Sequence, residues 1–331
     1  MSVPVRPDVG GTAVRPEDLE QYRRELTGYC YRMLGSFFEA EDAVQETMIR
    51  AWKGIDGFEG RSAVRSWLYR IATNVCLDQL RGRQRRAMPV DLGPSHAADS
   101  FTGRTRPEEA WMQPIPDARV LPDNGDPAEV ATLRETIRLA FVTALQHLPA
   151  RQRAVLILRD VLRWQAAEVA GLLETSVASV NSALQRARAT LAARDPEAAA
   201  TGPAPVVAAD QEALLAGYVD AFERYDIESL VALLHDDAVM SMPPYDFWLR
   251  GPVEMGRWFL GEGSGCRGSR LVATAANGAA AFGSYRPDPQ GGHFPWALQV
   301  IEVSGDRIVG HHNFLDTALF EAFGLPAHLP A

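Results

Sequence analysis

The sequence predicts a multidomain protein in which two all-α helical domains precede an α+β domain. Apolar residues recur at the helical spacing of three and four positions through most of residues 17–193. Pro-rich stretches at 87–128 and 195–208 divide the chain, and strand-like runs dominate after the second of them. A length of 331 residues also exceeds that of one ordinary domain.

The expected boundaries follow from these changes in composition. We expect a disordered N-terminus (1–15), a first helical domain (16–86), an acidic Pro-rich linker (87–128), a second helical domain (129–194), a second linker (195–208) and the α+β domain (209–331). The first linker region contains seven prolines between residues 87 and 129, so we expect it to hold no packed core.

Helices and strands are predicted from their periodicity and end signals. In the first helical domain the pattern covers residues 17–35, 40–53 and a third helix that runs from a Ser62 cap to about Arg85. We expect the helix at 40–53 to bury Ala43, Val44, Met48, Ile49 and Trp52. In the second domain the helices cover 129–147, 150–162, 165–173 and 177–193. In the α+β domain, helices at 211–224 and 227–234 precede strand-like runs at 270–275, 279–285, 297–304 and 307–314.

The net charge of −9 is distributed unevenly along the chain. Residues 201–331 contain 7 basic and 16 acidic residues, which accounts for all of it. Residues 61–86 carry a net charge of +6 and residues 151–194 carry +4, while the intervening residues 87–130 carry −5. Two basic patches inside a protein that is acidic as a whole are compatible with local contacts to nucleic-acid phosphates.

The three cysteines, at positions 30, 76 and 266, lie far apart and match no zinc-ligand spacing, which favours a reduced protein. The N-terminus lacks the apolar run of a signal peptide, and no segment has the length and hydrophobicity of a membrane-spanning helix. We therefore expect a cytoplasmic location, no membrane association, no metal and no cofactor.

The predicted helix at 40–53 has an acidic face. Glu41, Asp42, Gln45 and Glu46 are spaced at i, i+1, i+4 and i+5, opposite the apolar stripe. On pattern alone, a solvated polar face explains these residues better than a binding surface does. The same face would give electrostatic complementarity to a basic partner.

The third helix combines arginines with aromatic side chains. The residues expected on the other faces of this helix, outside its apolar stripe, are Arg65, Tyr69, Arg70, Asn74 and Arg81. Arginine contacts phosphates, and an aromatic face stacks on unpaired bases. Trp67 fits this surface and a core position equally well. The arginines that follow, up to Arg86, are expected to form a general phosphate clamp.

Residues 164–188 predict a helix-turn-helix, with Ser176 placed to cap the second helix. The side chains of that helix that can leave the apolar stripe and reach DNA are Ser179, Asn181, Ser182, Gln185, Arg186 and Arg188. Helical hairpins are common in proteins, so this pattern alone does not distinguish DNA binding from an ordinary packing role.

With these motifs in this order, residues 39–86 resemble region 2, and residues 148–188 resemble region 4, of the extracytoplasmic-function (ECF) class of bacterial sigma-70 factors. The resemblance implies that the acidic face binds the clamp-helix coiled coil of the polymerase largest subunit. It assigns the third helix, with the loop at 54–61, to the −10 promoter element, and the second helix of the hairpin to the major groove of the −35 element. The implied partners are core RNA polymerase and promoter DNA.

The chain departs from the family pattern at the helix-turn-helix. Glu174 stands in the turn where glycine is usual, and Asn181 and Ala183 replace a typical lysine and arginine. These changes predict fewer phosphate contacts and weaker binding to the −35 element. The acidic linker fits a segment that threads a basic channel of the polymerase, as the family implies, and an ordinary acidic tether explains it as well.

The α+β part resembles the SnoaL-like polyketide-cyclase/ketosteroid-isomerase superfamily, from HDDAVMSMPPYDFW to the strands ending in VGHHNF. That resemblance implies a cone, a curved sheet wrapped on helices around an apolar pocket. Candidate pocket residues are Tyr218, Phe222, Trp248, Trp258, Trp296 and His312, and the implied ligand is small and apolar. For each of them taken alone, a core position explains the residue better than a ligand contact does.

Catalysis in such a pocket requires an acid/base, for which the candidates are His235, Asp236, Asp237 and His312. Neighbouring residues on a strand point to opposite faces, so His235 with the aspartates, or the His311–His312 pair, makes an improbable metal site. Cys266 has no evident base beside it. We therefore expect no enzyme activity.

The interpretation that fits best is an ECF-type sigma factor whose fused SnoaL-like domain regulates its activity in cis. One alternative is a cyclase/isomerase-type enzyme with an N-terminal DNA-binding region. A third is a regulator that binds duplex operators without polymerase. Only the first requires region 2.

Overall fold

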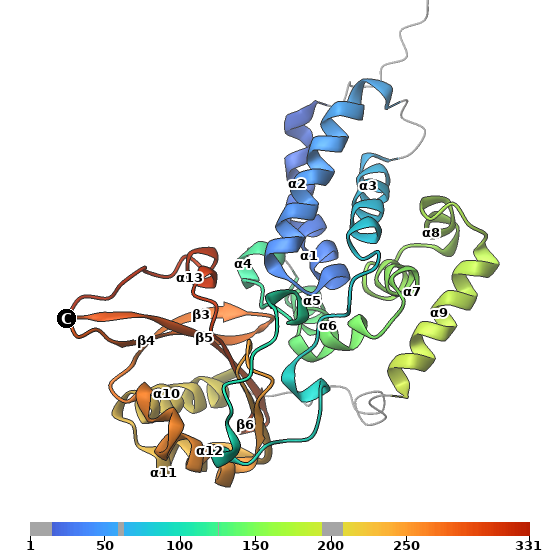
Figure 1. Cartoon of the computed structure of the whole chain (residues 1–331). Helices are drawn as coiled ribbons and strands as arrows, with labels where there is room; N and C mark the ends of the chain where they lie inside the picture. The colour runs from blue at the N-terminus through green and yellow to red at the C-terminus, as the bar shows by residue number, and fades with distance from the viewer. Residues whose placement is uncertain (1–14, 59–62, 125, 194–207) are drawn as a thin grey trace, which may run out of the picture.

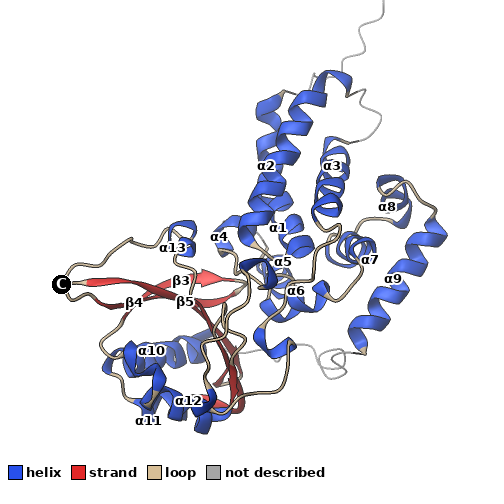
Figure 2. Cartoon of the chain, in the orientation of Figure 1, coloured by secondary structure: helices blue, strands red, loops and turns tan. Residues whose placement is uncertain are grey.

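The computed structural model of the chain describes residues 15–58, 63–124, 126–193 and 208–331 (Figure 1). The predicted disordered N-terminus, most of the second linker and the Ser62 cap lie outside these residues. The predicted fold class is confirmed, because helices fill the first part of the chain and a sheet with covering helices follows (Figure 2). In the described residues no helix is both long enough and apolar enough to cross a bilayer.

The first helical unit consists of three α-helices, preceded by a 3-10 turn. They are α1 (Arg23–Leu34), α2 (Phe37–Gly54) and α3 (Val64–Gln79). A short turn joins α1 to α2, in which Gly35 adopts a left-handed φ of 72° and the Ser36 side chain caps α2. Helix α3 ends at Gln79 and not near Arg85, because Gly82 has a φ of 71° and turns the chain away. The predicted burial of Trp52 is also wrong, since 61% of it is exposed.

The second helical unit contains α5 (Pro127–Glu135), α6 (Leu139–Gln146), α7 (Ala150–Leu156), a π-helical turn (Ile157–Val161), α8 (Ala166–Leu172) and α9 (Val177–Ala192). The single helix predicted at 129–147 is therefore wrong. It is interrupted because the carbonyl groups of Thr136 and Ile137 accept hydrogen bonds from Arg32 (3.0 Å) and Asn277 (2.6 Å), which lie far away in the sequence.

The C-terminal domain has a six-stranded sheet in the order β2-β1-β6-β5-β4-β3, in which β1 and β6 are parallel and the other neighbours are antiparallel. The strands are β1 (Leu234–Ser241), β2 (Trp248–Arg250), β3 (Arg270–Ala276), β4 (Ala279–Pro287), β5 (His293–Ser304) and β6 (Arg307–Phe314). The sheet curves around α10 (Ala208–Arg224), α11 (Ile227–Ala232) and α12 (Gly251–Leu260), which is the SnoaL-like architecture that the sequence predicted (Figures 1 and 2). A short helix, α13 (Ala318–Ala322), follows the last strand.

The linker at 87–128, which includes α4 (Asp117–Val120), packs into the protein, so the expectation that it holds no packed core is wrong. Trp111, Met112 and Ile115 are at most 2% exposed. Prolines lack an N–H group, so an extended Pro-rich segment brings fewer unpaired donors into a core.

Two apolar clusters stabilise the chain. One is continuous from the first helical unit through the linker and the second helical unit to the outer face of the sheet, for example Leu26, Met112, Leu139 and Val300. The other lies inside the cone, between the inner face of the sheet and α10–α12, and includes Phe222, Leu249, Phe259 and Ile301. The outer face of the sheet therefore shares its core with both helical units.

Candidate nucleic-acid interface

The acidic face of α2 is accessible. Asp42 and Gln45 are exposed, Glu41 and Glu46 are half-buried, and the Glu46 carboxylate pairs with Arg50 at 2.6 Å. The helix turns its other side, including Ala43 and Val44, into the core. All four predicted residues thus lie on the solvent-facing side of α2, where a helical partner can contact them.

The exposed part of α3 forms a basic hollow with its neighbours. Asn74 and Arg81 line a hollow of about 560 Å³ together with Arg50 and Arg151, the latter from α7. Asp78 lies in the same hollow and pairs with Arg81 at 3.3 Å. Because Arg50 also pairs with Glu46, three guanidinium groups are set against two carboxylates, which leaves a net positive charge suited to a phosphate. Arg70 is exposed on the same helix.

Tyr69 is not on the predicted DNA-facing surface. Its ring is fully buried between Tyr29 and Trp164, with centroid distances of 5.1 and 5.0 Å. Burial holds the pKa of its hydroxyl well above the usual value. The prediction was wrong because Trp164, which precedes α8, covers this side of α3, a contact that local periodicity cannot reveal.

Arg65 is half-buried at the same junction. Its guanidinium pairs with the Glu25 carboxylate at 2.7 Å and lies over the rings of Tyr69 and Trp164, at 5.4 and 5.6 Å from their centroids. Trp67 points elsewhere and stacks on Phe58 at 5.0 Å. Part of the predicted −10 surface is therefore occupied by the protein itself, and residues 59–62 of the predicted loop lie outside the described chain.

Helices α8 and α9 form the predicted helix-turn-helix. The Ser176 side chain accepts a hydrogen bond from the Ser179 N–H at 3.2 Å and caps α9. Glu174 has a φ of 51°, the left-handed conformation that explains why glycine suits this turn. The predicted DNA-facing residues are all exposed: Ser179, Asn181, Ser182, Gln185, Arg186 and Arg188. Arg188 already makes two hydrogen bonds with Asp160, at 2.6 and 2.9 Å.

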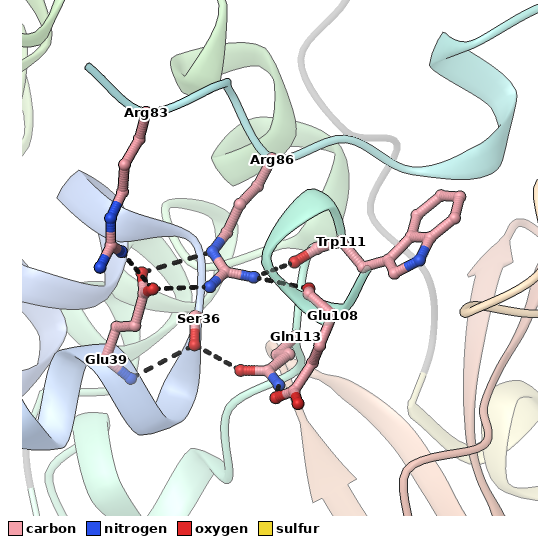
Figure 3. A network of polar contacts seen from close by, with 7 residues as sticks. All are labelled: Ser36, Glu39, Arg83, Arg86, Glu108, Trp111 and Gln113. Carbon is pink, nitrogen blue, oxygen red and sulfur yellow. Dashed lines mark hydrogen bonds and ion pairs between the residues drawn. The ribbon is translucent and has the colours of Figure 1, made fainter. Parts of the chain in front are cut away.

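The end of the first helical unit is tied to the linker by a polar network. Figure 3 shows its members, which are Ser36, Glu39, Arg83, Arg86, Glu108, Trp111 and Gln113. The Glu39 carboxylate pairs with Arg83 and with Arg86, the second at 2.8 Å. Arg86 is 7% exposed and donates to the Trp111 carbonyl at 2.6 Å. Arg86 therefore holds the linker, and the predicted phosphate clamp is wrong for it. For Arg83, which is exposed and pairs with Glu39 of α2, the clamp stays a prediction.

Sequence reasoning missed Asn277, in the β3–β4 turn. It is 1% exposed and has a φ of 55°, which asparagine tolerates better than most residues. Its amide nitrogen donates to the Tyr31 hydroxyl (2.7 Å) and the Ile137 carbonyl (2.6 Å), and its side-chain oxygen accepts from the Ile115 N–H (3.0 Å). One side chain of the C-terminal domain thus contacts α1, the linker and the second helical unit.

Two family models match the helical units: sigma-70 region 2 matches residues 19–86 and sigma-70 region 4 matches residues 138–191. The ECF RNA polymerase sigma factor SigG of Mycobacterium tuberculosis is 47% identical over 312 residues, which are 94% of this chain and 83% of that protein. The chain belongs to the ECF RNA polymerase sigma factors. The predicted family is confirmed, and with it the function of a promoter-specificity subunit.

Two further relatives differ in the share of this sigma factor that they match. The ECF RNA polymerase sigma factor SigW of Bacillus subtilis is 31% identical over 170 residues, 51% of this chain and 82% of its own length. The crystal structure of the Mycobacterium tuberculosis ECF sigma factor SigJ aligns with 94% of this chain and 100% of its own, with a TM-score of 0.59 at 22% identity. The likeness to SigJ shows a shared fold over that length.

The C-terminal domain of this sigma factor encloses a cavity of about 200 Å³. Phe222, Trp258 and Trp296 line it as predicted, whereas Trp248 and His312 do not. The Trp248 indole donates to the carbonyl of Gly93 in the linker at 3.0 Å. His312 lies on the outer face of the sheet, beside Glu302 at 3.3 Å, because the alternation of β6 turns it away from the cone.

The sixth predicted pocket residue, Tyr218, does not line the cavity either, and its hydroxyl is hydrogen-bonded inside the core. It donates to Gln299 at 2.8 Å and lies 3.0 Å from His311 Nε2. Burial, with a smaller contribution from His312, lowers the pKa of His311 to about 3. His311 is therefore a neutral core residue at physiological pH.

Proposed function

We propose that this sigma factor binds core RNA polymerase through the acidic face of α2 and binds promoter DNA through α3 and α9. We also propose that its C-terminal domain regulates it in cis, by holding regions 2 and 4 in a closed arrangement. The exposure of the α2 face and of the α9 side chains supports the first part. The α2 face and the α9 side chains are therefore both accessible in the closed arrangement.

The single observation that carries the regulatory proposal is the position of Asn277. Its three hydrogen bonds reach region 2 at Tyr31, the linker at Ile115 and the start of region 4 at Ile137. The Tyr31 hydroxyl in turn donates to the Gln113 carbonyl at 2.9 Å. A buried polar group is costly to leave unpaired. If region 2, the linker or region 4 separates from the C-terminal domain, at least one of these hydrogen bonds is lost.

The closed arrangement conflicts with simultaneous contact to two promoter elements. Helix α3 packs directly against α7 and α8, and Trp164 covers Tyr69. The −10 and −35 elements are about 25 base pairs apart, which is roughly 85 Å at 3.4 Å per base pair. Regions 2 and 4 must therefore separate for both to be bound.

We also propose that the C-terminal domain is not an enzyme. The acid/base candidates His235, Asp236 and Asp237 are exposed on β1, and His312 faces away from the cone. None of the four lines the 200 Å³ cavity, and Glu262, whose carboxylate is at its wall, is exposed to solvent. General acid–base catalysis requires such a group within hydrogen-bond reach of the substrate.

Run-off transcription with purified core polymerase tests the proposal. We expect the Asn277→Gly variant to initiate more transcripts than the natural chain at equal concentration, because glycine keeps the turn and removes the three contacts. The matched control is Asp306→Gly, in the exposed β5–β6 turn. Equal or lower activity of Asn277→Gly, with core affinity unchanged, would contradict regulation by closure.

A further inference from the structure

The cavity in the C-terminal domain has the size and walls of a site for one aromatic ring. Its volume is about 200 Å³, and the walls are mostly aromatic rings and methionine side chains, including Phe101, Trp258, Trp296 and Met240. An apolar cavity of about 150 Å³ is large enough for benzene. The remaining space admits one small polar substituent.

A cationic group with unused hydrogen-bonding capacity lies in the wall of this cavity. The Arg286 guanidinium carbon is 3.3 Å from the ring centroid of Trp296, and its Nη2 donates to the Cys266 sulfur at 3.3 Å. Its Nε is buried and has no hydrogen-bond partner among the described residues. Among the described residues no carboxylate oxygen lies within 4.0 Å of the Arg286 guanidinium nitrogens, although the exposed Glu262 lines the same cavity.

Arg286 lines the cavity without an ion-pair partner among the described residues, and an anionic ligand can supply one. A carboxylate accepts two parallel N–H bonds from a guanidinium, and the resulting charge-assisted pair is stronger than a neutral hydrogen bond. The hydrogen bond from Nη2 to the Cys266 sulfur is weak by comparison. The cavity therefore combines space for one ring with a site for one negative charge.

One wall of the cavity belongs to the linker. Phe101 packs edge-on against Tyr245 and Trp258 of the C-terminal domain, with centroid distances of 5.0 and 5.1 Å. The linker is held on either side: the Ala98 N–H donates to Glu254 at 2.8 Å and the Arg106 N–H to the Pro244 carbonyl at 3.0 Å. Figure 1 shows this stretch passing over α12. A molecule in the cavity contacts the linker directly.

We propose that the cavity binds a single-ring aromatic carboxylate, with its ring against Phe101 and Trp258 and its carboxylate on Arg286. Because Phe101 completes the site, the bound molecule stabilises the docked linker and with it the closed arrangement. Only the effect of the ligand on sigma-factor activity rests on the proposed function. Binding itself needs neither polymerase nor DNA, so the two proposals fail separately.

NMR titration of the full chain measures the binding of benzoate, the probe, and of benzyl alcohol, its neutral counterpart. We expect benzoate to bind at least tenfold more tightly than benzyl alcohol. Arg286→Leu should remove that preference, and Arg286→Lys should retain part of it. Equal affinity for the two probes, no binding of benzoate at about 10 mM, ten times a weak dissociation constant of about 1 mM, or an unchanged preference in a folded Arg286→Leu variant would overturn the proposal.

Coupling to the linker is tested by trypsin cleavage after Arg104, whose side chain is 72% exposed. Its carbonyl accepts from the Asp246 N–H at 3.3 Å, so cleavage requires the linker to leave the domain. Benzoate at ten times its dissociation constant should slow cleavage about tenfold, by linkage. Phe101→Ala should weaken benzoate binding and, at ten times the variant's own dissociation constant, should lose most of this protection. Unchanged cleavage with benzoate bound would overturn the coupling.

Discussion

Substitution of Asn277 by glycine tests how strongly the C-terminal domain is docked. The variant loses three cross-domain hydrogen bonds, at 2.6, 2.7 and 3.0 Å, while glycine adopts the φ of 55° without strain. A buried hydrogen bond contributes about 1 kcal/mol net, so the three contribute about 3 kcal/mol. That corresponds to roughly a 150-fold increase in the opening equilibrium, at 1.4 kcal/mol per factor of ten.

Amide hydrogen exchange at Gly278 measures this opening. Its N–H donates to the Asp117 carboxylate at 2.8 Å across the same junction, so it exchanges only when the domains separate or the turn is disrupted. We expect exchange to accelerate by about two orders of magnitude in Asn277→Gly, and to stay within a few-fold in Asp306→Gly. Acceleration of less than tenfold would refute the assignment of Asn277 as the main cross-domain contact.

Three further predictions concern the two binding surfaces and the core of the C-terminal domain. Reversing charge at Asp42 and Glu46 (both to Arg) should weaken core-polymerase binding at least tenfold without unfolding the chain, as measured by fluorescence anisotropy, and unchanged affinity would remove the α2 assignment. Arg186→Ala should lower the slope of log affinity for promoter DNA against log salt by about one, and an unchanged slope would place this side chain away from phosphate. Because His311 has a folded pKa of about 3 against 6.5 when unfolded, the free energy of unfolding should fall as the pH drops from 6.5 towards 3, by up to about 1.4 kcal/mol per unit from this residue. A folded His311→Gln variant should lack this contribution in urea unfolding at several pH values, and an equal slope in both proteins would contradict the buried neutral state.

Features set by local interactions could be predicted from the sequence. The helix-turn-helix follows from the apolar spacing of Val180, Leu184 and Ala187 and from the Ser176 cap, all within a few turns of helix. The acidic face of α2 follows from the same periodicity. The curved sheet followed from a family resemblance, because short strand-like runs do not reveal their pairing.

Features set by contacts between distant segments could not be predicted. Tyr69 has the spacing of a surface residue, and only its packing against Trp164, 95 positions later in the chain, makes it a core residue. The break between α5 and α6 depends on hydrogen bonds from Arg32 and Asn277. A turn asparagine such as Asn277 usually serves its own turn, so no sequence signal distinguishes one that joins three parts of a protein.

The distance between regions 2 and 4 tests the central claim most directly. Spin labels at Gln21→Cys, at the start of region 2, and at Ala189→Cys on α9 are both exposed and lie outside the predicted binding residues, and pulsed electron paramagnetic resonance reports the distance between them once Cys266 is replaced by serine. The closed arrangement predicts one short distance in the free protein and a longer one, consistent with elements roughly 85 Å apart, in the complex with core polymerase and promoter DNA. The same short distance in a complex that transcribes would contradict the account.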